Sequence, residues 1–225
     1  LAFLVDVAAE IRSVYPAGAR FTICSDGRVF GDLVAVDDAA ITQYGEDIDT
    51  LIGELETDAI DTFATDDLLD GEHDAMRSFL IAHYAEPLAE VEQRARDYPH
   101  HRAMWNGMQR FLFEDRLASD PGRRTQLRKK CGELAHAVIQ RSNAWTRVVA
   151  ECFPTAMRLS IHPQPAHSDK IGIRLADHED VWLTPWHATA VERAGGFTLM
   201  KRKDAEALGA RLVERDGRPS HLVID

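Results

Sequence analysis

Cationic and hydroxyl side chains alternate with apolar ones along two short runs in the last third of the chain. The first run carries Arg158, Ser160 and His162 at every second position, and the second run carries Lys170 and Arg174. Guanidinium and ammonium groups suit a phosphate or a carboxylate, and histidine exchanges protons near neutral pH. The pattern therefore predicts either a site for an anionic small molecule or the solvated outer face of a sheet.

Two further groups of polar residues would extend such a site. Thr184 and His187 flank a Pro-Trp pair at the end of a third apolar run, and Ser25, Asp26 and Arg28 follow a short apolar run near the N-terminus. Ligands of open α/β sheets bind at the carboxyl ends of strands, which makes the second group a site candidate. An ordinary Asp-Gly hairpin turn is the alternative.

The ten histidines invite a search for metal ligands. His167, Asp169 and His221 match the two-histidine, one-carboxylate set of non-haem iron oxygenases. That set belongs to a β-sandwich, whereas this sequence is rich in helical patterns, so an iron oxygenase is the weaker alternative and we predict no metal site. Motifs of zinc hydrolases, serine hydrolases, NTPases and dinucleotide-binding proteins do not occur in the sequence.

Composition and charge narrow the class of protein. The 225 residues carry a formal charge of −11, which argues against general affinity for nucleic acid, and no apolar run approaches the roughly 18 residues of a membrane span. A local cationic cluster on such an acidic chain favours an anionic small molecule as partner. Three separate cysteines without a CxxC pair predict a reducing, cytoplasmic location.

The charged residues are unevenly distributed along the chain. No lysine or arginine occurs between Arg28 and Arg77, whereas residues 46–74 are crowded with aspartate and glutamate, and we expect that segment to be solvated. The chain begins at Leu1 rather than at a methionine. We therefore expect that an N-terminal extension is missing from it.

The hydrophobic periodicity predicts an α/β fold in which strands come first, helices follow and strands return. The connection between the runs at 157–162 and 170–175 is too short for a crossover helix, so we expect an antiparallel pair. Expected helices cover residues 1–15, 39–44, 48–55, 74–96 with a kink at Pro87, 104–112, 123–152 and 203–212, and expected strands cover 21–24, 157–162, 170–175, 181–187, 197–200 and 221–224.

Five segments in order along nearly the whole chain resemble those of a known family. They are residues 25–32, 110–115, 158–163, 170–173 and 184–187. Together they resemble the isonitrile (isocyanide) synthase family, also called the pyoverdine and dityrosine biosynthesis family. One departure is Ala35, at a position where the family pattern leads us to expect glycine.

The resemblance implies a single α/β domain over residues 1–225, with a Rossmann-like mixed sheet and a helical layer inserted between the N-terminal and C-terminal strands. It also implies a metal-free lyase without a cofactor. Such enzymes join the amino group of an aromatic amino acid, here tyrosine or alternatively tryptophan, to the keto carbon of ribulose 5-phosphate, which becomes the isonitrile carbon. An iron and 2-oxoglutarate oxygenase often acts next in such pathways.

The resemblance also suggests roles for the candidate residues. Catalytic roles fall to Asp26, His162, Lys170 and His187, and substrate-binding roles to Ser25, Arg28, Arg158, Ser160, Arg174 and Thr184. Lys170 either holds an anion or forms a Schiff base with the ketose, because a lysine beside other cations loses its proton more readily. A non-catalytic protein that binds an amino acid or a sugar phosphate is the alternative to an enzyme.

Overall fold

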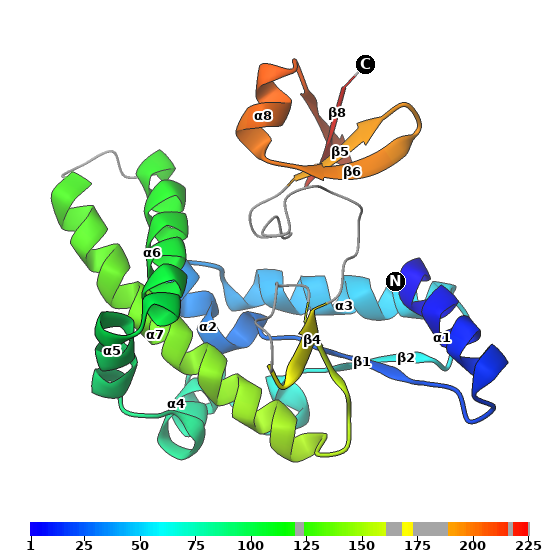
Figure 1. Cartoon of the computed structure of the whole chain (residues 1–225), viewed down its shortest axis with the longest axis horizontal. Coiled ribbons are helices and arrows are strands. Elements are labelled where there is room, and N and C mark those ends of the chain that lie inside the picture. Colours follow the sequence, from blue (N-terminus) through cyan, green and yellow to red (C-terminus); the bar gives the residue numbers. More distant parts are fainter. Residues whose placement is uncertain (120–123, 161–167, 173–188, 216–217, 225) are drawn as a thin grey trace. The chain divides into compact units, whose positions relative to one another are not determined.

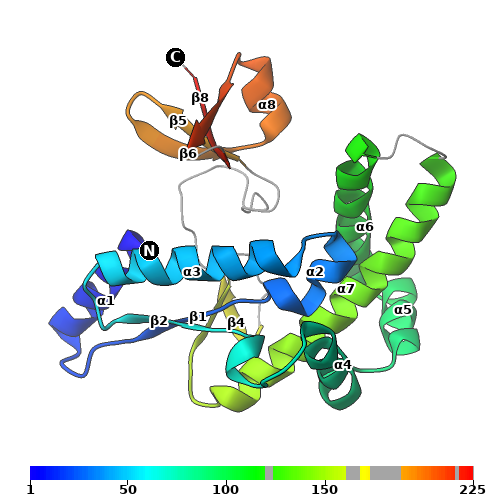
Figure 2. The same cartoon turned by 180° about the vertical axis from the view of Figure 1, so that it is seen from behind.

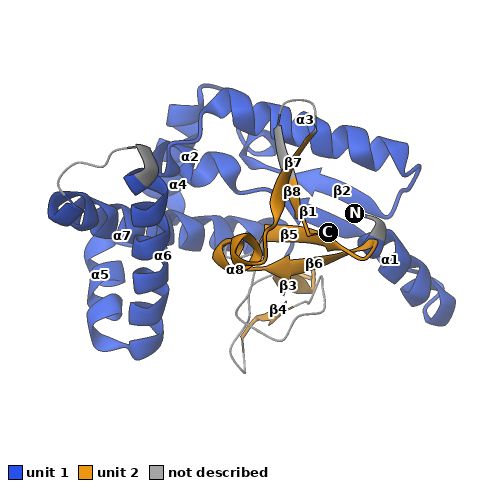
Figure 3. Cartoon of the chain, turned by 90° about the horizontal axis from the view of Figure 1, so that it is seen from above, with its two compact units in different colours: residues 1–154 blue, residues 155–225 orange. Residues whose placement is uncertain are grey.

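The computed structural model describes residues 1–119, 124–160, 168–172, 189–215 and 218–224. The chain divides into two compact units, Leu1–Pro154 and Thr155–Asp225, which Figure 3 distinguishes by colour. No described helix is both long enough and apolar enough to cross a bilayer.

The first unit begins with the helix α1 (Ala2–Val14), which a βαβ arrangement follows. The elements of that arrangement are β1 (Phe21–Cys24), α2 (Gly27–Val34), α3 (Asp38–Glu54) and β2 (Ile60–Phe63). The strands β1 and β2 are parallel, with Phe21 opposite Ile60 and Cys24 opposite Phe63. Figures 1 and 2 show α3 running alongside the two strands. The helix expected over residues 1–15 is confirmed as α1.

The rest of the first unit is helical. Its elements are the short 3-10 helix η1 (Thr65–Asp67), α4 (His73–Tyr84), α5 (Leu88–Asp97), α6 (Pro99–Ser119) and α7 (Arg124–Cys152). The 29-residue helix α7 packs against α2, α4, α5 and α6. Its buried residues Val138, Trp145 and Val148 join Val29 and Leu80 in the main core. Burial of this apolar stripe, rather than helix propensity, stabilises a helix of this kind.

Helix predictions were wrong in their boundaries at three places. The helix expected over 203–212 covers only Arg202–Ala207, and Arg211–Arg215 is a strand. The segments 39–44 and 48–55 form one helix, α3, because the glycine between them, Gly45, is tolerated inside a helix at a cost of only about 1 kcal/mol. The segment 74–96 forms two helices rather than one kinked helix. Pro87 caps the start of α5, since proline lacks the N–H of a helix interior and disfavours a helical residue before it.

Ala35 ends α2 in a left-handed conformation, with φ 60° and ψ 37°. Glycine adopts this conformation without steric cost, whereas a residue with a Cβ is strained in it. The glycine expected at this position from the family pattern would therefore fit the C-terminus of α2 better than alanine does.

Replacing two glycines of the α6–α7 hairpin by alanine should change the free energy of unfolding in opposite directions. A Cβ at Gly132 of α7 would lie 2.9 Å from Gln109 Nε2 and 3.1 Å from Trp105 Cζ2, whereas no described atom lies within 4 Å of a Cβ at Gly107 of α6. We expect Gly132→Ala to lower the free energy of unfolding by about 1 kcal/mol through overpacking. Gly107→Ala should raise it by about 0.5–1 kcal/mol through helix propensity. Thermal unfolding of both variants measures this, and shifts of the same sign would contradict it.

The second unit is built around strands. Its elements are β3 (Arg158–Ser160), β4 (Lys170–Gly172), β5 (Thr189–Arg193), β6 (Gly196–Met200), α8 (Arg202–Ala207), β7 (Arg211–Arg215) and β8 (Arg218–Val223). The last four strands form a sheet in the order β6-β5-β8-β7, in which β5 and β8 are parallel and the other pairs antiparallel. Val191, Ala205 and Leu222 form its core. The strand expected at 181–187 lies outside the described residues.

The strand pair β3–β4 is parallel, so the antiparallel prediction was wrong. That prediction assumed that only a helix can return the chain for a parallel pair. The nine residues between Ser160 and Lys170 can span up to about 30 Å, while the chain must return by only about 7 Å along the strand. A return segment without a crossover helix therefore suffices.

The predicted α/β class is confirmed, and so is the position of the helices α4–α7 between the N-terminal and C-terminal strands. The single mixed sheet is not observed, because the described strands form three separate sheets: β1–β2, β3–β4 and the four-stranded sheet. Only the four-stranded sheet is mixed. The Rossmann-like organisation remains a prediction.

Candidate active site

The turn at Ser25 and Asp26 lies at the carboxyl end of a parallel strand pair. Ser25 N–H donates to the carbonyl of Phe63 at 2.8 Å. Asp26 precedes the first residue of α2, and Val29 N–H in the first turn of that helix donates to the Asp26 carbonyl at 3.0 Å. The hairpin alternative is therefore wrong, because residues 29 and 30 continue a helix rather than a return strand. This edge is where α/β proteins place ligands.

Arg28 lies in the first turn of α2 and is buried. Its Nε contacts Asp66 Oδ2 at 2.7 Å, its Nη1 contacts Asp38 Oδ1 at 3.3 Å, and its Nη2 donates to Thr42 Oγ1 at 2.7 Å. Each nitrogen of the guanidinium group thus has a protein partner. The assignment of Arg28 as an anion contact stays a prediction, and it would require Arg28 to exchange one of these partners.

Three arginines from three other helices donate to backbone carbonyls of α2. Arg77 Nε of α4 contacts the Arg28 carbonyl at 2.9 Å, and Arg141 Nη1 of α7 contacts the Val29 carbonyl at 3.1 Å. Arg116 Nη2 of α6 contacts the Leu33 carbonyl at 2.7 Å. These bonds fix both ends of α2, and with it the turn that precedes the helix.

Ion pairs complete this arrangement, which we call the α2 ion network. Its guanidinium groups are those of Arg28, Arg77 and Arg141, and its carboxylates are those of Asp32, Asp38, Asp66 and Asp74. His73 Nδ1 lies 3.3 Å from Asp38 Oδ2 and, when protonated, brings the charge only to neutral. The network therefore has no surplus positive charge for an anionic ligand.

Sequence reasoning missed Asp38, Arg77 and Arg141 in this network. One signal pointed to it: Arg28 and Arg77 border the stretch without basic residues, and both pair with aspartates that lie between them. That stretch was expected to be solvated. This holds for α3, in which no residue is fully buried, and also for Asp66 and Asp74, whose side chains are 45% and 92% exposed.

The pKa of Asp38 gives a prediction for the pH dependence of stability. Burial alone would raise this pKa, but the hydrogen bond and charge of Arg77, with His73 and Arg28, hold it below its usual value. Glu86 behaves alike: burial raises its pKa, and hydrogen bonds from Arg94 and Asn143 more than offset the rise. The folded state then binds fewer protons than the unfolded state below about pH 4.

We therefore expect full stabilisation from both carboxylates above about pH 4.5 and its progressive loss as the pH falls through their lowered pKa values. Urea unfolding between about pH 6 and about pH 3 measures this slope. Asp38→Asn should flatten the acid limb, whereas Asp49→Asn, in exposed α3, should leave it unchanged. An unaltered acid limb in Asp38→Asn would contradict the assignment.

The second candidate region is the strand pair β3–β4. Arg158 is directly opposite Lys170, and Ser160 is opposite Gly172, so the polar residues of both strands share one face as expected. Arg158 Nη1 contacts Asp169 Oδ2 at 2.8 Å, and the backbone N–H of Lys170 donates to Ser168 Oγ at 3.2 Å. Gly172 contributes no side chain opposite Ser160.

Exposure distinguishes the two faces of β3–β4. The Arg158 side chain is 15% exposed, whereas Leu159 is 38% and Ile171 is 50% exposed. The expectation that the apolar residues form the buried face is thus wrong. At Arg158 the polar face is less exposed to solvent than the apolar face is at Leu159 and Ile171. A solvated outer sheet surface would instead expose its polar side chains most.

A family model decides which group of proteins this chain belongs to. The model described as pyoverdine/dityrosine biosynthesis protein matches residues 1–213. The chain belongs to this family. The match continues across both compact units, so the family's characteristic sequence is not confined to either of them.

Individual members of the pyoverdine/dityrosine family are similar over nearly the whole chain. An L-tryptophan isonitrile synthase, AmbI1 from Fischerella ambigua, is 43% identical over 226 residues, covering 100% of this chain and 71% of its own. An L-tyrosine isonitrile synthase from Pseudomonas aeruginosa is 42% identical over 227 residues, covering 98% and 69%. The crystal structure of PvcA from the same species has a TM-score of 0.88 at 40% identity, covering 99% and 74%.

Four of the predicted site residues, His162, Arg174, Thr184 and His187, lie outside the described residues. So does His167 of the iron-site alternative. His221 is buried, and its Nε2 lies 3.1 Å from Glu192 Oε2. Among the described residues, no group of three histidine, cysteine, aspartate or glutamate side chains is arranged to hold a metal ion. The relatives are named as isonitrile synthases, so the comparisons give the iron-oxygenase alternative no support.

Proposed function

We propose that this protein is an isonitrile synthase that acts on an aromatic L-amino acid and takes its isonitrile carbon from ribulose 5-phosphate. The observation that carries the proposal is the similarity of more than 40% identity, over nearly the whole chain, to one synthase named for L-tryptophan and another named for L-tyrosine. We retain tyrosine as the favoured substrate and tryptophan as the alternative.

The residues on the polar face of β3–β4 suit the binding part of this reaction. Arg158 and Lys170 are neighbours across the strand pair and present two cations to the phosphate of the sugar or to the carboxylate of the amino acid. Ser160 adds a hydroxyl group on the same face. We assign proton transfers during imine formation and elimination to His162 and His187, as the family resemblance suggests.

Asp26 is assigned to the amine or to the sugar hydroxyls. It follows the carboxyl end of β1, on a turn that the α2 ion network holds in place. A rigid support is what a binding carboxylate requires, because small displacements of such a group lower the rate strongly.

Lys170 has two proposed roles that one experiment separates. As an anion contact, it stays non-covalent; as a nucleophile, it forms a Schiff base with the keto carbon of ribulose 5-phosphate. Borohydride reduction in the presence of ribulose 5-phosphate, followed by peptide mapping, should then yield an adduct at Lys170. A lack of adduct at this residue under turnover conditions would contradict the covalent role.

The proposed function is tested by product formation. The protein is incubated with tyrosine or tryptophan and with ribulose 5-phosphate carrying carbon-13 at the keto carbon. We expect an isonitrile, identified by its infrared stretch, with the label in the isonitrile carbon. Binding of either substrate without product would favour a non-catalytic binding protein, and an unlabelled isonitrile would contradict the carbon donor.

We also propose how the reaction proceeds and where it takes place. The reaction is of the carbon–carbon lyase type and uses neither a metal nor another cofactor. The enzyme acts in the cytoplasm, and an iron and 2-oxoglutarate oxygenase consumes its product. For a reaction without a metal, we expect activity to persist after metals are removed and a strong chelator is present.

A further inference from the structure

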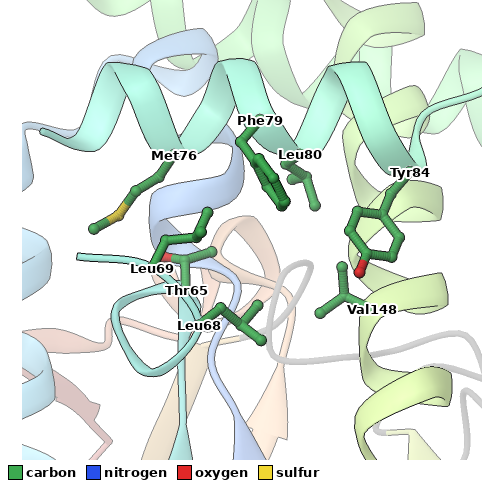
Figure 4. Close-up of a pocket in the computed structure, with 8 residues that line it drawn as sticks. All are labelled: Thr65, Leu68, Leu69, Met76, Phe79, Leu80, Tyr84 and Val148. Atoms are coloured by element: carbon green, nitrogen blue, oxygen red, sulfur yellow. The ribbon is translucent and has the colours of Figure 1, made fainter. Parts of the chain in front are cut away.

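An apolar pocket opens in the first unit between η1, α4 and α7 (Figure 4). Thr65 and Leu68 line one side, Phe79 and Tyr84 of α4 line the opposite side, and Val148 of α7 closes it. Figure 4 shows the α4 side chains directed toward those of the η1 segment. No charged residue contributes to its lining.

This pocket adjoins the edge of the sheet that carries the Ser25–Asp26 turn. Thr65 follows the end of β2 by two residues, and Ser25 N–H is bonded to the last residue of that strand, Phe63, at 2.8 Å. The residue next to Thr65, Asp66, contacts Arg28 of α2 at 2.7 Å. Two chain segments that leave neighbouring parallel strands therefore bring the pocket and the turn to one edge.

The pocket is shallow and has an apolar rim. Its empty volume of about 230 Å³ includes the space open to solvent at its mouth, and the enclosed part has room for about one water molecule. A ring therefore enters only when Leu68 and Phe79 move apart. Phe79 is 39% and Leu68 is 37% exposed, so two large apolar side chains remain in contact with water at the mouth, whereas Val148 is fully buried. An apolar ring placed here would cover both exposed side chains.

Thr65 provides a second observation that points to a ligand. It is 7% exposed, and its Oγ1 has no hydrogen-bond partner among the described residues. A buried hydroxyl group without a partner is costly and is uncommon away from functional sites. A ring that carries a hydroxyl or an N–H group at its edge would supply the missing partner.

We propose that this pocket receives the aromatic ring of the amino-acid substrate, an inference that rests on the proposed function. The ring packs between Leu68 and Phe79, and Thr65 contacts its polar edge. The amino group then lies toward the strand ends, on the side of the Ser25–Asp26 turn. Leu68 and Thr65 are accordingly specificity-determining residues of the site.

Filling the pocket tests this assignment. Leu68→Trp is compared with Leu88→Trp, a matched control because Leu88 of α5 has nearly the same exposure, 38% against 37%, and does not line the pocket. Calorimetric binding of L-tyrosine and L-tryptophan is measured alongside turnover. We expect Leu68→Trp to weaken binding and to raise KM for the amino acid at least about tenfold, because the larger side chain occupies the space that the ring would take. The control should leave both unchanged.

The KM for ribulose 5-phosphate distinguishes a pocket effect from general damage, because it should stay the same in Leu68→Trp. In Thr65→Val, which keeps the shape, the preference for tyrosine over phenylalanine should fall about three- to tenfold. Binding of tyrosine and of tryptophan that is unaffected by Leu68→Trp, or absent from the wild-type protein for both amino acids, overturns the pocket assignment. A wild-type protein that binds tyrosine but makes no isonitrile overturns the proposed function and leaves the pocket assignment supported.

Discussion

Replacing Arg158 by alanine should lower kcat/KM for ribulose 5-phosphate by about 100-fold, because a charge-assisted contact to the substrate anion is lost. Arg158 is directly opposite Lys170, and its side chain is 15% exposed. A guanidinium group in that position forms two hydrogen bonds with a phosphate, which an ammonium group does not reproduce. Steady-state kinetics with either aromatic amino acid measures the effect.

Two further variants make this prediction specific. Arg158→Lys keeps the charge but not the bidentate geometry, so an intermediate loss is expected. Arg193→Ala removes an exposed arginine from the end of β5 in the same unit and should have little effect. If Arg158→Ala retains near-normal kcat/KM, the polar face of β3–β4 does not bind the phosphate.

Replacing Arg77 by methionine should lower the free energy of unfolding by about 3 kcal/mol, because it leaves the partly buried Asp38 carboxylate and the Arg28 carbonyl without this donor. The Arg77 side chain is 8% exposed; it pairs with Asp38, contacts Asp74 Oδ1 at 2.8 Å, and donates to the Arg28 carbonyl at 2.9 Å. Methionine keeps the apolar stem and removes only the charge and the donors. Urea unfolding monitored by tryptophan fluorescence measures the change.

Arg20→Met is the matched control for this variant. Arg20 contacts Asp61 at 2.9 Å, but its side chain is 67% exposed, so the loss should be about 1 kcal/mol or less. Equal losses of unfolding free energy in the two variants would mean that burial of the α2 ion network contributes nothing to stability. If Arg77→Met also lowers turnover at a temperature where it is fully folded, the network positions the Ser25–Asp26 turn as well as stabilising the unit.

Local patterns predicted the individual elements better than their pairing. Alternation along residues 158–160 and 170–172 correctly predicted two strands with their polar residues on one face. It did not predict their direction, because alternation is the same in parallel and antiparallel pairs and the length of the connection was a poor guide. Residues 60–63 were not predicted as a strand at all. That strand is only four residues long, and it is stabilised by its pairing with β1.

Arg28 shows the corresponding limit for the candidate site. As a residue type after a strand end, it is indistinguishable in the sequence from an anion contact. Its partners Asp38, Thr42 and Asp66 lie 10 to 38 positions away, so only the folded chain shows that they occupy all three guanidinium nitrogens. The apolar pocket was missed for the same reason, since Leu68, Phe79 and Val148 come from three separate segments.

The sequence by itself determined the family, the α/β class and the turn after β1, because motifs and hydrophobic periodicity are properties of neighbouring residues. Only the tertiary structure decided that β3 and β4 are parallel and that Arg28 belongs to an ion network. It also decided that Thr65 contributes to an apolar pocket at the strand ends. These features depend on contacts between distant segments, whose free energies arise only when the chain packs.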